Sequence, residues 1–126
     1  MNEELSQKNV LGEKLEVCSA DPITGWLRDG CCNTNETDHG FHTVCTRVTT
    51  KFLEWAKIAG NDLITPHPEF DFPGLKDGDS WCVCAHTYDQ SIAAGTVCKV
   101  YLKKTNQKTL EIIPLAKLKQ HAIDLS

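Results

Sequence analysis

Residues 81–86 read WCVCAH, and their alternation predicts a β-strand with two unlike faces. Tryptophan, valine and alanine share one face, which suits a hydrophobic core. The other face carries the side chains of Cys82, Cys84 and His86. Thiols and imidazoles are the ligands that zinc and other borderline-soft metals prefer, so this face is the first place to look for chemistry.

The rest of the chain mixes helix and strand signals. Residues 50–59 carry apolar side chains at helical spacing, with a threonine before them as a cap and Gly60 after them. Residues 98–103 alternate as a strand, and residues 110–113 are its expected hairpin partner. A last helix is expected over residues 114–122. We therefore predict an α+β fold, with a small mixed or antiparallel sheet and helices on one face.

Two further segments show no regular helix or strand pattern. Residues 61–80 are rich in proline and glycine, which predicts a long irregular loop wrapped over the core. Residues 1–8 are polar and are expected to form a flexible tail. Residues 9–126 then form a single domain, as a chain of 126 residues allows.

Composition excludes several classes of partner. The net charge of −4 argues against nucleic acid, and no apolar run is long enough to cross a membrane. The polar N-terminus does not resemble a secretory signal, which predicts a soluble, cytoplasmic protein. The lysine-rich C-terminal part leaves a protein partner or a homo-oligomer open.

The 7 cysteines are the most informative feature. In a reducing compartment such a set points to a metal, to thiol chemistry or to buried thiols, and the odd number excludes complete pairing within the chain. Zinc is the cofactor that the residue types would suit. The candidate metal ligands are Cys31, Cys32, His42, Cys45, Cys82 and Cys84.

Thiol catalysis is the second reading of the same residues. A nucleophilic cysteine needs a nearby base or positive charge. The segment 28–32 reads RDGCC, so Arg28 precedes the two candidate nucleophiles, Cys31 and Cys32, and His42 is the candidate base. The sequence contains neither a C-x-x-C redox motif nor a G-x-S-x-G motif.

Several long motifs resemble the DUF2237 family, which is cysteine-rich and largely bacterial. The resemblance covers residues 9–122 and rests on LEVCSADPITG (15–25), RDGCCNT (28–34), HTVC (42–45), GNDL (60–63), TPHPE (65–69) and FPGLKDGDSWCVCA (72–85). It implies a two-layer α/β sandwich and no assigned activity. His86 and Cys98 lie outside the family motifs, so the resemblance favours a site built from the CC and CxC segments with the pair His42 and Cys45.

Three hypotheses remain after this reading. Our working prediction is a binding or assembly module whose thiols are buried. The first alternative is a zinc-binding protein that uses cysteine and histidine ligands. The second is a thiol-dependent enzyme with its nucleophile at Cys31 or Cys32, and the sequence does not decide whether the protein is an enzyme.

Overall fold

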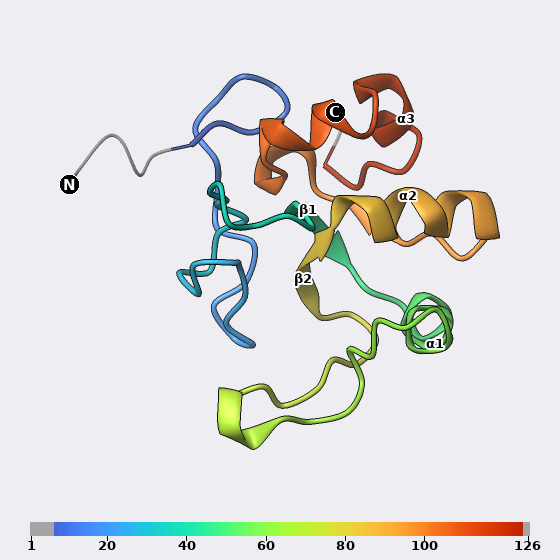
Figure 1. The fold of residues 1–126 in the computed structure, drawn as a ribbon. Coiled ribbons are helices and arrows are strands. Elements are labelled where there is room, and N and C mark those ends of the chain that lie inside the picture. The colour runs from blue at the N-terminus through green and yellow to red at the C-terminus, as the bar shows by residue number, and fades with distance from the viewer. Residues whose placement is uncertain (1–6, 125–126) are drawn as a thin grey trace.

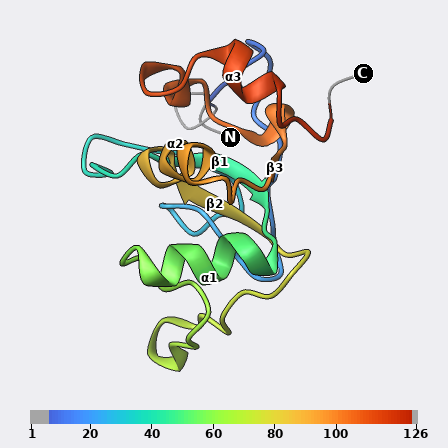
Figure 2. The same cartoon turned by 90° about the vertical axis from the view of Figure 1, so that its right-hand side faces the viewer.

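Three short strands form one antiparallel sheet in the computed structural model, which describes residues 7–124. The strands are β1 (His42–Arg47), β2 (Ser80–Cys84) and β3 (Lys99–Val100), and their order in the sheet is β2-β1-β3. Figure 1 labels β1 and β2, and Figure 2 labels all three strands. The predicted α+β class with an antiparallel sheet is confirmed. Most of the predicted tail, residues 1–6, lies outside the described residues.

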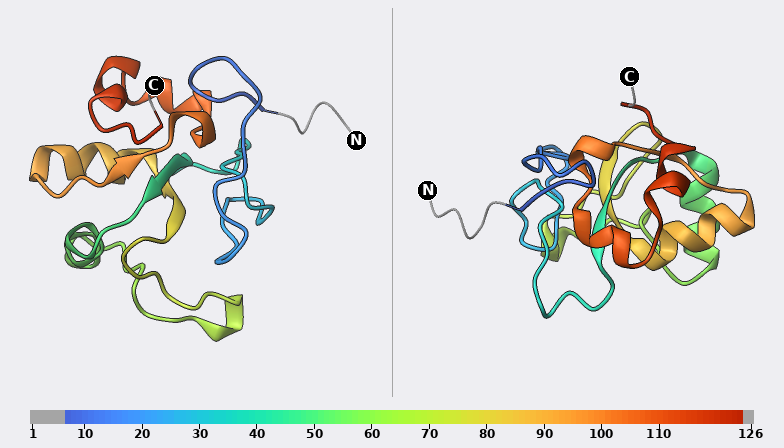
Figure 3. Two further views of the ribbon diagram at one scale, coloured as in Figure 1. Left: turned by 180° about the vertical axis from the view of Figure 1, so that it is seen from behind. Right: turned by 90° about the horizontal axis from the view of Figure 1, so that it is seen from above.

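Helices α1 (Thr50–Ile58), α2 (Ala85–Ala94) and α3 (Leu115–Lys119) lie on one side of the sheet (Figure 2). The chain from residue 7 to β1, blue to cyan in the figures, lies on the other side without regular structure (Figure 3). This division confirms the prediction that the helices cover one face. No helix within residues 7–124 is long and apolar enough to cross a membrane.

The helix-facing side of the sheet holds the main hydrophobic core. Val44 of β1 pairs with Val83 of β2, and both are almost fully buried. Phe52 of α1 and Tyr88 of α2 are buried in the same cluster. Burial of this apolar surface is the main stabilising contribution that fixes the helices on the sheet.

Helix α1 begins where the sequence predicts. The side chain of Thr49 accepts a hydrogen bond from the backbone N–H of Phe52 at 3.1 Å, which satisfies one of the free donors at the helix start. The chain after α1 is the predicted long loop, with one short 3-10 turn at Pro68–Phe70. Phe72 and Leu75 are buried and hold this loop against the core.

Two local predictions are wrong. The strand expected over residues 81–86 ends at Cys84, because the chain turns into α2 and Ala85 donates its N–H to the Phe41 carbonyl at 2.8 Å. The exposed His86 therefore belongs to a helix and does not continue the row of Cys82 and Cys84.

The expected hairpin is also absent from the described residues. Residues Gln107–Glu111 form a 3-10 helix instead of a strand. The free edge of β3 is occupied by the C-terminal part of the chain: Val100 donates to the His121 carbonyl, and Ile123 donates to the Val100 carbonyl, both at 2.9 Å. No edge is left there for a hairpin partner.

Candidate functional site

A β-bulge decides which side chains share the face of the sheet opposite the helices. Cys45 lies opposite Cys82, and His42 lies opposite Cys84. Between these two pairs β1 contains two residues, whereas β2 contains one. The register shift falls between His42 and Val44. Since side chains alternate along a regular strand, the bulge turns His42 away from the side of Val44 and onto the face of the cysteines.

Asp38 fixes the imidazole of His42. Its side chain is fully buried, and one carboxylate oxygen lies 2.6 Å from Nδ1 of His42, whose side chain is 38% exposed. The other oxygen accepts the backbone N–H of His42 at 2.9 Å and the hydroxyl of Thr34 at 2.8 Å. Because the carboxylate accepts, Nδ1 carries the hydrogen, and Nε2 is left as the ring's acceptor.

The indole ring of Trp26 stacks on the imidazole ring of His42. The two rings are stacked, with centroids 5.5 Å apart and planes 13° from parallel. The indole N–H donates to Asn35 at 3.1 Å and also contacts the hydroxyl of Thr37 at 3.3 Å. The ring of His42 is therefore restrained along its edge by Asp38 and on its face by Trp26.

Cys84 is an unpaired, half-buried thiol beside this imidazole. It donates to the Gly40 carbonyl at 2.7 Å. A methyl group on Gly40 would lie 3.1 Å from Cε1 of His42 and 3.5 Å from the sulfur of Cys84, so both side chains lie against this glycine. Cys84 is also the N-cap of α2, where an anion interacts favourably with the helix dipole.

A cavity of about 340 Å³ opens onto Cys84 and His42. Its size falls at the lower end of the range for small-molecule sites in proteins. The guanidinium group of Arg28 lies 5.3 Å above the ring of Trp81 and lines this cavity. Among the described residues of the lining, Arg28 is the one that is permanently charged, which favours a small ligand with a negative charge.

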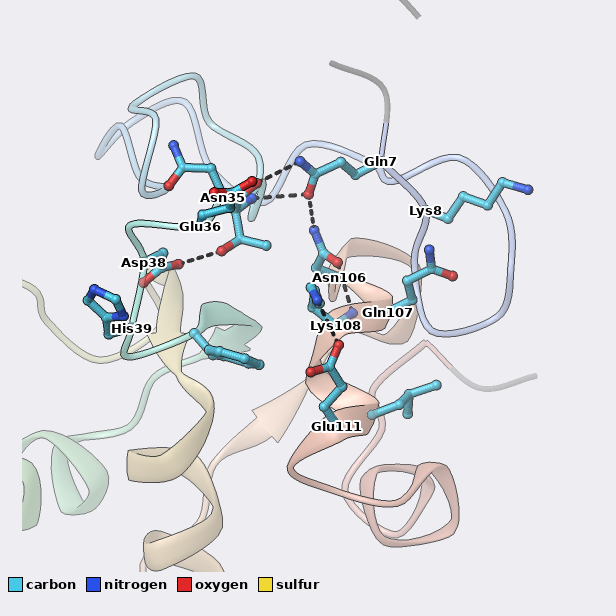
Figure 4. Close-up of a pocket in the computed structure, with 13 residues that line it drawn as sticks. Gln7, Lys8, Asn35, Glu36, Asp38, His39, Asn106, Gln107, Lys108 and Glu111 are labelled. Carbon is cyan, nitrogen blue, oxygen red and sulfur yellow. Dashed lines mark hydrogen bonds and ion pairs between the residues drawn. The ribbon is translucent and has the colours of Figure 1, made fainter. Parts of the chain in front are cut away.

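A larger cavity, of about 920 Å³, lies between the N-terminal segment, the loop before β1 and the 3-10 helix Gln107–Glu111 (Figure 4). Its polar groups mostly pair with one another. Gln7 bonds to Asn106, and Lys108 forms an ion pair with Glu111 at 2.8 Å. None of its lining residues in the described part of the chain is a cysteine, so the smaller cavity is the better candidate for chemistry.

Four of the cysteines are joined in two disulfides. Cys18 pairs with Cys45, and Cys32 pairs with Cys82. The expectation that the buried cysteines are free thiols is therefore wrong for these four, because their sulfurs meet on the face opposite the helices. Three of these four cysteines, all but Cys18, belong to the six residues predicted as metal ligands. Metal binding by those six residues stays a prediction.

The two predicted nucleophiles differ from Cys84 in bonding and in position. Cys32 is in a disulfide, and Cys31 does not line the cavity that holds Arg28 and His42. Burial and the nearby Asp29 carboxylate raise the pKa of the Cys31 thiol, against a smaller opposite effect of a lysine. A raised pKa leaves less thiolate at neutral pH, which disfavours Cys31 as a nucleophile.

The remaining free thiol is structural. Cys98 is buried in the main core, and burial raises its pKa to about 12. Cys84 is therefore the free cysteine that lies beside a histidine. The contact of Asp38 with His42 could not be predicted from the sequence, since one acidic residue in a polar loop gives no signal of such a contact.

The fold and this arrangement define a class of small α+β domain. It has a cluster of two disulfides, and a cysteine and a histidine that line a small cavity, with a buried aspartate bonded to the histidine. A family model described as an uncharacterized protein conserved in bacteria, DUF2237, matches residues 8–122. The chain belongs to the DUF2237 family, as its motifs predicted. A comparison with curated proteins gave no match.

Proposed function

We propose that the protein is a thiol-dependent enzyme that hydrolyses or transfers the acyl group of a small, negatively charged substrate. In this proposal Cys84 is the nucleophile, His42 is the base and Asp38 orients the base. The observation that supports it best is the contact of 2.6 Å between His42 and the buried Asp38, with His42 placed opposite Cys84 in the sheet. A nucleophile, a base and a group that orients the base are the parts that such catalysis requires.

The chemistry follows from the positions of the protons. His42 accepts the thiol proton at Nε2, and the sulfur of Cys84 attacks the carbonyl carbon of the substrate. The leaving group departs with the proton from His42, which leaves an acyl thioester on Cys84. Water, deprotonated by His42, then hydrolyses the thioester, and the thiol is restored. The Asp38 carboxylate stabilises the imidazolium in both steps.

The thiol has to change its hydrogen bond before it reacts. In the structure the Cys84 thiol donates to the Gly40 carbonyl and not to His42. Rotation about the Cys84 Cα–Cβ bond redirects the sulfur within the same cavity. Catalytic hydrogen bonds are often loose without substrate and tighten when it binds, so this geometry is compatible with the role.

Arg28 supplies the proposed selectivity. Its guanidinium group is placed over Trp81 in the lining of the cavity, at 5.3 Å from the ring centroid. A carboxylate on the substrate would pair with this group, and such pairs are strong because arginine offers several donors in a planar fork. The proposal therefore favours acyl substrates with a second, anionic end.

The proposal moves the nucleophile of the thiol-enzyme hypothesis from Cys31 or Cys32 to Cys84. Its partners in the original hypothesis, Arg28 and His42, are kept. The binding-module hypothesis stays a prediction, and an enzyme of this kind is compatible with further contacts elsewhere on the surface.

Turnover of two model esters tests the proposal. We would compare p-nitrophenyl acetate with mono-p-nitrophenyl succinate, and locate any acyl group by mass spectrometry of the quenched protein. We expect acylation on Cys84, faster turnover of the anionic ester, and loss of this preference in Arg28→Gln. Equal turnover by wild type and Cys84→Ala would contradict the proposal, and Cys98→Ser is the matched control because its thiol lies in the core.

A further inference from the structure

The two disulfides lie directly against each other. The sulfur atoms of Cys18, Cys32 and Cys82 all lie within 4.8 Å of one another, and Cys45 is bonded to Cys18. Cys45 and Cys82 also face each other across β1 and β2. The four sulfurs therefore form one compact group, supplied by β1, β2 and the irregular segment before β1.

This group is closed to solvent. Cys32 and Cys45 are fully buried, and Cys18 and Cys82 are at most 5% exposed. Tyr101 packs against the cluster, and the ammonium of Lys104 lies 4.5 Å from the centre of the Tyr101 ring. The Lys104 ammonium therefore lies against the aromatic ring that packs on the four sulfurs.

The spacing fits a tetrahedral metal site. Zinc binds thiolate sulfur at about 2.3 Å, which places the sulfurs of a tetrahedral site about 3.8 Å apart. Three sulfurs already within 4.8 Å of one another need small side-chain movements to reach that spacing. A closed set of four cysteines is typical of structural zinc sites, in which no position is left open for a substrate.

We propose that the protein binds one zinc ion through Cys18, Cys32, Cys45 and Cys82 when both disulfides are reduced. Each disulfide takes two electrons and two protons from a dithiol reductant, which is itself oxidised to a disulfide. Zinc then displaces the four thiol protons. Two equivalents of a small disulfide oxidise the four thiolates, take up the four electrons and four protons as thiols, restore the two disulfides and release the ion, so the same cluster is held together in both redox states.

The site differs from the metal site that the sequence suggested. It includes Cys18 and leaves out Cys31, His42 and Cys84. The proposal is independent of the proposed enzymatic function, since Cys84 and His42 take no part in it. The two proposals are therefore tested by different variants.

Cobalt(II) is the probe, because tetrahedral cobalt thiolate sites give intense visible and charge-transfer bands. We would titrate cobalt into protein reduced with a dithiol and freed of metal, and into protein with both disulfides intact. We expect one cobalt ion per reduced chain, displacement by zinc, and no binding to the oxidised chain. Four of the 7 thiols should become protected from alkylation when zinc is added.

Variants decide which cysteines are the ligands. We expect Cys18→Ser to lose or change the cobalt spectrum, and Cys84→Ser and His42→Gln to leave it unchanged. Absence of cobalt binding to the reduced wild type would overturn the proposal, and so would a spectrum that depends on Cys84 but not on Cys18. If Cys18→Ser does not fold, the comparison of reduced and oxidised wild type still decides the question.

Discussion

His42 of β1 stands opposite Cys84 of β2, and the bulge between His42 and Val44 is the reason. Without this extra residue, the imidazole would share the side of Val44, which is packed in the main core. The bulge therefore places a base beside a free thiol on the other face of the sheet. Asp38 then holds the imidazole in one orientation.

Asp38→Asn tests this arrangement. The amide can offer a hydrogen to Nδ1 and so favours the wrong tautomer of His42, as well as weakening three hydrogen bonds. We expect alkylation of Cys84 to slow by about tenfold, which is less than the roughly 100-fold or more that a general base itself contributes, because His42 is kept and only its orientation is disturbed. Unfolding in urea should show a loss of about 1–3 kcal/mol, because the site is buried. Glu36→Gln, an exposed neighbour in the same loop, is the control and should change neither quantity.

Two glycine substitutions distinguish the loss of stability caused by backbone strain from the loss caused by a steric clash. Gly25 and Gly60 have nearly the same positive φ, 101° and 100°. A Cβ on Gly25 would lie 2.2 Å from the Cys31 carbonyl oxygen, whereas nothing lies within 4 Å of one on Gly60. We expect Gly60→Ala to cost about 1–2 kcal/mol from its positive φ alone. Gly25→Ala should cost at least about 2 kcal/mol more. Equal unfolding midpoints in urea would contradict the close approach of the chain at Gly25.

The disulfides should stabilise the fold to different extents. The pair Cys32 and Cys82 closes a longer stretch of chain than Cys18 and Cys45, with sequence separations of 50 and 27. The loop-entropy relation predicts losses of about 4 and about 3.5 kcal/mol when each pair is replaced by alanine. Urea unfolding of the two double variants, with a chelator present, measures this difference. A larger loss for the shorter loop would show that packing and not chain entropy dominates.

Cys98 should make stability depend on pH in alkaline solution. Burial raises its pKa in the folded state from 9.0 to about 12, so the folded protein holds this proton more tightly than the unfolded chain does. The resulting stability is complete below pH 9 and is lost as the pH rises from 9 toward 12. Unfolding midpoints measured from pH 7 to 11 should fall less steeply for Cys98→Ala than for the wild type. Parallel curves would show that the Cys98 thiol does not titrate on unfolding.

Parts of this structure could be predicted from the sequence because they depend on local signals. Helix α1 follows from apolar spacing and a threonine cap, and both lie within a few residues. The hairpin prediction failed because β3 pairs at its edge with residues near His121, and no local pattern encodes that contact. Periodicity correctly put Cys82 and Cys84 on one face of a strand, but it wrongly extended that strand to His86.

The site could be predicted only in part for the same reason. Arg28 and His42 were selected by residue type, and both line the cavity. Cys31 and Cys32 were predicted as nucleophiles because they are close in sequence to Arg28. Cys84 instead lies beside His42 because β1 pairs with β2. Such pairing depends on the register of two strands far apart in the chain, and a bulge changes that register without a clear mark in the sequence.

The most direct test of the account is the alkylation rate of each free thiol in the native, disulfide-intact protein. Iodoacetamide at neutral pH, with mass spectrometry of each cysteine peptide, separates Cys31, Cys84 and Cys98. We expect Cys84 to react fastest, and we expect His42→Gln to slow its reaction while leaving the other two thiols unchanged. Faster reaction of Cys31, or a Cys84 rate that does not respond to His42→Gln, would contradict the assignment of Cys84 as the activated thiol.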